Sequence, residues 1–137
     1  MKYRFASFGF LAWAAALLVV QSCGGGAQQP PFEVSYEGIV IRLASDSESR
    51  KPFLRVDVTI YYAAELGADE LVVARLTGAE GKDAAIRGLG NMPPVEEVEG
   101  DQNFAQDTAE EQIKESFTNQ GLPAPQKVKF SSFVIQG

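Results

Sequence analysis

The sequence predicts an α/β (α+β) domain: a small, mainly antiparallel sheet of three to four strands with two helices packed on one face. Residues 53–62 alternate between two sets of side chains, which is typical of a strand with one buried face. Ala109, Ile113 and Phe117 lie four residues apart, as in the buried stripe of a helix. Apolar residues make up 45% of the 137 residues and charged residues 22%, which is ordinary for a globular domain.

Two further strands are predicted, and the alternation slips by one residue in each of them. In residues 32–43 the slip falls at Gly38, and in residues 127–136 it falls at Ser131 and Ser132. A slip inside an otherwise regular strand is typical of a β-bulge, and glycine is a common residue there. The polar residues 44–52 between the first two strands predict a loop or hairpin connection.

The rest of the chain is predicted to be mostly helical. Residues 65–91 carry an interrupted apolar face, with breaks expected at Gly78 and Gly81 and a helix end at Gly90 and Asn91. A second helix is expected to be capped by Asp107 or Thr108 and to run through residue 119, because Gly121 and two prolines follow.

The composition excludes several kinds of chemistry. The chain contains no histidine, so a histidine triad, a histidine general base and histidine metal ligands are all ruled out. A single cysteine forms neither an internal disulfide nor a cysteine zinc site. The net charge of −6 argues against a nucleic-acid partner, which requires a basic face. We therefore expect no enzymatic activity, no catalytic or metal-binding residues and no cofactor.

The N-terminus has the pattern of an export signal. Lys2 and Arg4 precede sixteen uncharged, mostly apolar residues, and Cys23 follows them. Sixteen helical residues span only about 24 Å, less than the ~30 Å hydrocarbon core of a bilayer. The segment before Cys23 resembles a bacterial lipobox, so we expect a signal peptide in residues 1–22, a lipidated Cys23 and a flexible tether in residues 23–31. The alternative is a retained N-terminal membrane helix; both place a domain of residues 32–137 in the cell envelope.

Residues 96–111 form an acidic region with seven carboxylates. Asp101, Asn103 and Asp107 suggest a calcium loop, but Ala105 and Gln106 occupy positions where that loop needs a ligand and a glycine. A looser cation site remains an alternative to a solvated acidic loop. On that alternative the protein is a generic cell-envelope lipoprotein that binds a cation or small ligand through this region.

The last strand carries the pattern V-x-F-x-x-F-V-x-Q, formed by Val128, Phe130, Phe133, Val134 and Gln136. A helix and a short loop precede this strand, and basic residues followed by an aromatic-aliphatic strand occur at Arg50, Lys51, Phe53, Leu54, Arg55 and Val56. On these motifs, residues 32–136 resemble the flagellar basal body-associated protein FliL family. That family usually keeps an uncleaved transmembrane helix, and the predicted lipoprotein signal departs from this.

The resemblance implies a membrane-anchored periplasmic α/β domain that supports the flagellar motor stator through protein contacts and that can self-associate. It implies an interface rather than an active site. The residues expected to contribute to this interface are Arg50, Lys51, Arg55, Phe130 and Phe133. Two interpretations are open for the three basic residues. They contact an acidic partner, or they are simply solvated at the start of a strand and discourage its pairing with other strands.

Overall fold

The computed structural model describes residues 29–137, of which Pro31–Gly137 form one compact unit. The predicted signal peptide, residues 1–22, and Cys23 lie outside the described residues. The elements, in chain order, are β1 (Phe32–Arg42), β2 (Phe53–Tyr62), the 3₁₀ helix η1 (Ala64–Ala68), α2 (Glu70–Thr77), α3 (Ala79–Gly90), α4 (Val95–Val98), α5 (Gln102–Asn119) and β3 (Lys127–Gln136).

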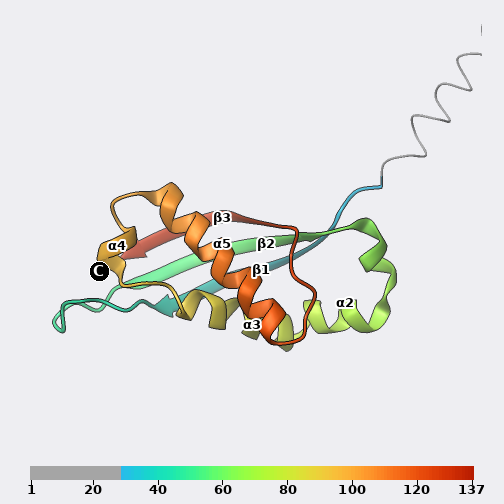
Figure 1. Ribbon diagram of the computed structural model, residues 1–137, viewed down its shortest axis with the longest axis horizontal. Helices are drawn as coiled ribbons and strands as arrows, with labels where there is room; N and C mark the ends of the chain where they lie inside the picture. The colour runs from blue at the N-terminus through green and yellow to red at the C-terminus, as the bar shows by residue number, and fades with distance from the viewer. Residues whose placement is uncertain (1–28) are drawn as a thin grey trace, which may run out of the picture. The chain divides into compact units, whose positions relative to one another are not determined.

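The strands form one antiparallel sheet in the order β1-β2-β3, so β2 is central and the last strand of the chain lies at an edge. Helices α3 and α5 cross the same face of this sheet (Figure 1). Every second residue of β2 is buried beneath them, including Leu54, Val56 and Ile60, each of which is fully inaccessible to solvent. The predicted α+β class, with an antiparallel sheet and helices packed on it, is confirmed.

Both predicted bulges are present, and both lie opposite Asp57 of β2. The pairing of β1 shifts between Tyr36 and Ile39, so that two residues of β1 face one residue of β2. Gly38 has a φ of 66°, which an L side chain rarely adopts, and its backbone N–H donates to Asp57 Oδ1 at 2.6 Å. On the other side, Ser131 is the extra residue of β3. The two edge strands therefore bend at the same level of the sheet.

Helix α5 begins earlier than the sequence predicts. Its N-cap is Asp101, whose side chain accepts from the backbone N–H groups of Asn103 and Phe104, so the prediction of Asp107 or Thr108 as the cap is wrong. The physical reason is that the buried stripe extends one turn further back, to Ala105, which is fully buried. The helix ends at Asn119, as predicted, and Gly121 follows with a φ of 72°.

The first helical region contains the predicted break at Gly78, which separates α2 from α3. The second predicted break is wrong, because Gly81 lies inside α3 and is buried. A side chain at Gly81 would overlap the Tyr36 hydroxyl and the Leu76 carbonyl oxygen. Glycine is therefore used at this position for a close approach between α3 and β1.

Candidate protein-interaction surface

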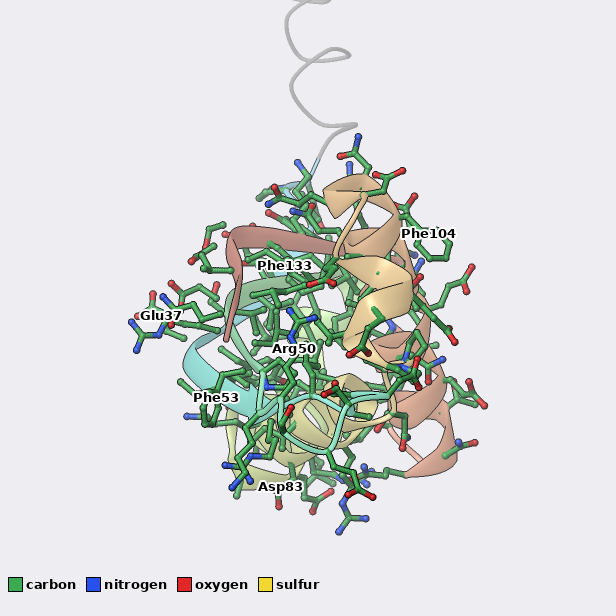
Figure 2. The ribbon with its side chains drawn as sticks, turned by 90° about the vertical axis from the view of Figure 1, so that its left-hand side faces the viewer. Glu37, Arg50, Phe53, Asp83, Phe104 and Phe133 are labelled. Carbon is green, nitrogen blue, oxygen red and sulfur yellow. The ribbon has the colours of Figure 1, made fainter. Side chains whose placement is uncertain are left out.

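Among residues 29–137, no helix covers the second face of the sheet. Its side chains come from the residues of each strand that alternate with the buried set, and they lie in rows across the three strands. Figure 2 labels two of them, Phe53 and Glu37, on the side of the molecule away from α5. A sheet face that lacks a covering layer is the place where a partner can be accommodated without unfolding the domain.

Three large apolar side chains lie together on this open face. Val40 is 55% exposed, Phe53 40% and Val134 43%. The register explains their proximity: Val40 and Val134 flank Arg55 in one row, while Phe53 stands in the next same-face row of the central strand, between Arg42 and Gln136. We refer to Val40, Arg42, Phe53, Arg55 and Val134 as the open-face patch.

The basic residues of the patch are held close to its apolar members. The guanidinium carbon of Arg42 lies 5.3 Å from the centre of the Phe53 ring, within the range of a cation–π interaction. Arg55 is the central residue of its row and is exposed. Within residues 29–137, neither Arg42 nor Arg55 forms a salt bridge. The patch therefore presents two arginines that form no salt bridge within the described residues, beside exposed apolar surface.

Arg50, which the sequence placed in the interface, is used inside the domain instead. Its Nη1 and Nη2 donate to the two oxygens of Glu99 at 3.0 and 2.5 Å, and its Nε donates to the carbonyl oxygen of Gly137 at 2.8 Å. Glu96 lies 3.8 Å from the same guanidinium and also accepts from the Ser45 hydroxyl and the Asp46 N–H. This network joins the β1–β2 loop, α4 and the C-terminal residue.

The network lowers the pKa of both carboxylates below their ordinary value. The hydrogen bond from Arg50 is the main cause for Glu99, and the hydrogen bond from Ser45 is the main cause for Glu96. Both groups are therefore held in the charged form. Arg50 is positioned to fix the β1–β2 loop.

Phe130 and Phe133 lie on the helix-covered face of β3. Their rings meet edge to face with centroids 5.1 Å apart, and Phe133 is buried. Figure 2 places Phe133 on the inner side of the molecule, whereas Phe104 of α5 points outward. Of the five residues predicted for an interface, Arg55 is on the open face, Lys51 is exposed just before β2, and the other three have partners within the domain.

A groove of about 420 Å³ runs beside the edge of β3, between that strand and the helices α4 and α5. The residues that line it are Val98, Glu99, Gln102, Ala105, Phe133, Val134 and Ile135. Side chains of helix α5 already form hydrogen bonds with two backbone groups of this edge strand. Gln102 Nε2 donates to the Phe133 carbonyl at 3.3 Å, and Glu110 accepts from the Val128 N–H at 3.2 Å. Covering an edge strand in this way discourages its pairing with other chains.

The acidic region does not gather its carboxylates. Among residues 29–137 no group of three or more acidic or cysteine side chains is placed so that it could hold a metal ion. Asp101 caps α5, and Glu96 and Glu99 belong to the Arg50 network. The same part of the chain contains no helix that is long and apolar enough to cross a membrane.

Part of the open-face patch is predictable from the sequence. Phe53 falls on the less buried face of a clearly alternating strand, and Arg55 was selected as a candidate. Val40, Arg42 and Val134 are not predicted, because their proximity depends on the strand order β1-β2-β3 and on its register, which alternation within one strand does not give. Comparison with known proteins adds no further residue, because no protein-family model and no curated protein matches the chain.

Proposed function

We propose that this protein is a membrane-tethered, FliL-like module of the cell envelope that supports the flagellar motor stator through protein contacts. The observation that carries the proposal is the C-terminal arrangement of α5, a short loop and β3. The strand bears the pattern of Val128, Phe130 and Phe133 and has a bulge at Ser131. It belongs to an α+β domain, which is the fold class that the resemblance implies. In this proposal the aromatic residues build the domain, and the open-face patch makes the contact.

The proposed role requires no reaction at the contact surface. A tethered domain acts by raising the local concentration of its contact surface near a membrane partner, which increases occupancy without any additional contact. Residues 23–31, containing three glycines after Cys23 and then Pro30 and Pro31, are suited to such a tether. The anchor itself, by a lipid on Cys23 or by a retained helix, is part of the proposal.

Deletion of the gene tests this function. We expect cells without the protein to assemble filaments normally but to swim more slowly in a viscous medium, since a stator-supporting module affects torque and not assembly. The measurements are swimming speed against viscosity and filament counts by electron microscopy, with re-expression of the wild-type gene as the control. Unchanged motility at every viscosity would contradict the proposal.

The alternative of a cation-binding lipoprotein has less support, because Glu96, Glu99 and Asp101 already have partners within the domain. A thermal-shift measurement distinguishes the two functions. A ligand present at a hundred times its Kd stabilises the folded protein by about 2.7 kcal/mol. A rise in Tm at millimolar calcium would favour the alternative.

A further inference from the structure

We propose that the open-face patch binds an acidic segment of a partner protein, one that presents apolar side chains bordered by carboxylates. This inference deepens the proposed function, on which it rests for the identity of the complex in the cell. The surface and the chemistry of its occupant are argued from the domain alone, so they are tested separately.

The first argument is the grouping of exposed apolar residues. Six large apolar side chains among residues 29–137 are exposed, and three of them, Val40, Phe53 and Val134, lie in two neighbouring rows of one sheet face. The other three lie on three different helices, α2, α3 and α5. Grouped apolar surface that includes an aromatic residue is typical of the centre of an interface, whereas scattered single residues are not.

The second argument is charge complementarity. Arg42 and Arg55 stand among these apolar side chains, and no salt bridge within the described domain neutralises them. The next row contains two acidic residues, Glu37 and Asp57, so the positive region ends there. Asp57 also accepts the Gly38 N–H. Arginine forms paired hydrogen bonds with carboxylates, and Arg42 is already oriented over Phe53, which lowers the entropy lost on binding. These features fit a partner whose carboxylates pair with Arg42 and Arg55 while its apolar side chains contact the apolar members of the patch.

A third observation concerns where the patch lies along the sheet. The predicted tether joins the domain at Phe32, whereas Arg42 is at the opposite end of the same strand. Eleven residues of strand cover roughly 33–36 Å. The patch therefore lies at the end of the sheet opposite the point where the predicted tether joins the domain.

Peptide binding to the full chain, in a zwitterionic detergent, tests the proposal. The probes are two fluorescent helical peptides with the same leucine stripe, bordered by Glu in one peptide and by Lys in the other. We expect fluorescence anisotropy to show that the Glu peptide binds at least about tenfold more tightly than the Lys peptide, since each tenfold is 1.4 kcal/mol. Binding should weaken as salt is raised, because screening acts on charge pairs at the rim of an interface.

Variants locate the binding surface. Arg55→Glu, the milder Arg55→Gln, and Phe53→Ser should each weaken binding of the Glu peptide, with the charge reversal causing a loss of about tenfold or more. The matched controls are Lys82→Glu, the same kind of charge reversal on the exposed part of α3, and Leu71→Ser, the loss of an 80% exposed apolar side chain on α2. Circular dichroism checks that every variant is folded. The controls should bind like the wild type.

Several results would overturn the proposal: no binding of either peptide, equal binding of both, or equal losses in the variants and the controls. Self-association that Arg55→Glu abolishes would assign the patch to a second copy of the chain instead. Patch-dependent binding to phosphatidylglycerol vesicles without peptide binding would assign it to lipid. The proposed function is judged separately by the swimming of the deletion strain, so either idea can fail while the other stands.

Discussion

Gly81 is a residue at which α3 passes close to Tyr36 of β1. The Tyr36 hydroxyl donates to the Leu76 carbonyl at 2.5 Å, and both atoms lie where a side chain at Gly81 would project. We therefore expect Gly81→Ala to force the helix away from the sheet and to destabilise the fold by about 1–3 kcal/mol, the usual cost of overpacking. The measurement is the midpoint of urea unfolding.

Gly90→Ala is the matched control for that substitution. Gly90 also lies in α3, but a side chain there meets no atom within 4 Å. Alanine should stabilise the helix by roughly 0.4–1 kcal/mol, because it reduces the conformational freedom of the unfolded chain. If both substitutions shifted the urea midpoint in the same direction, the close approach at Gly81 would not be the cause of the effect.

The Arg50 network makes stability depend on pH. The pKa values of Glu96 and Glu99 are lowered in the folded state, so their contribution is present above the unfolded value of 4.5 and is lost as the pH falls through the folded values. We expect the urea midpoint of the wild type to fall more steeply below about pH 4.5 than that of Arg50→Gln, which lacks the ion pair. Parallel pH profiles would show that the network contributes nothing to stability.

At the scale of elements, the two bulges opposite Asp57 control which side chains face the helices. A bulge reverses the parity of the strand beyond it, so Val34 and Ile39 are both buried although they differ in parity. On β3, Val128 and Phe133 are buried together for the same reason. The open-face patch lies beyond the bulges on both edge strands, so its composition depends on them.

Gly38→Val tests this dependence. A branched side chain at a φ of 66° is strained by roughly 1–2 kcal/mol. We expect a lower urea midpoint and weaker binding of the Glu peptide, since relief of the strain changes the register that places Val40 beside Arg55. Gly100→Val is the control, because Gly100 has open space around it and no positive φ. If the Gly38→Val variant bound the Glu peptide as tightly as the wild type, the arrangement of the patch would not depend on the bulge.

The elements with strict periodicity were predictable from the sequence, and those set by packing were not. Residues 53–62 and both bulges follow from alternation alone, and the end of α5 follows from Gly121. The start of α5 was missed because Ala105 gives a weaker apolar signal than Ile113, although it is equally buried. Gly81 was misread because sequence does not distinguish a glycine that ends a helix from one that allows close packing.

At the scale of the whole molecule, the candidate surface was predicted only in part. Net charge places the protein in an acidic class, but the unpaired arginines of the patch become apparent only when the partners of Arg50 are known. The sequence places Arg50 in the loop 44–52 and Arg55 in the strand 53–62, and it predicts the same interface for both. The fold separates them, because one turns to α4 and the C-terminal residue, whereas the other projects from the open face.

In the proposed function the tether holds the domain near its partner, so loss of the tether should resemble deletion of the gene. We expect the purified membrane form to have the mass of a chain that begins at Cys23 and carries acyl chains. Cys23→Ser should remove the acyl mass and reduce swimming in viscous medium, while circular dichroism shows a folded domain. Ser22→Ala is the control, since it keeps the thiol and a small residue before it. A wild-type mass that includes Met1 would contradict lipidation and favour a retained helix, in which case Cys23→Ser should leave swimming unchanged.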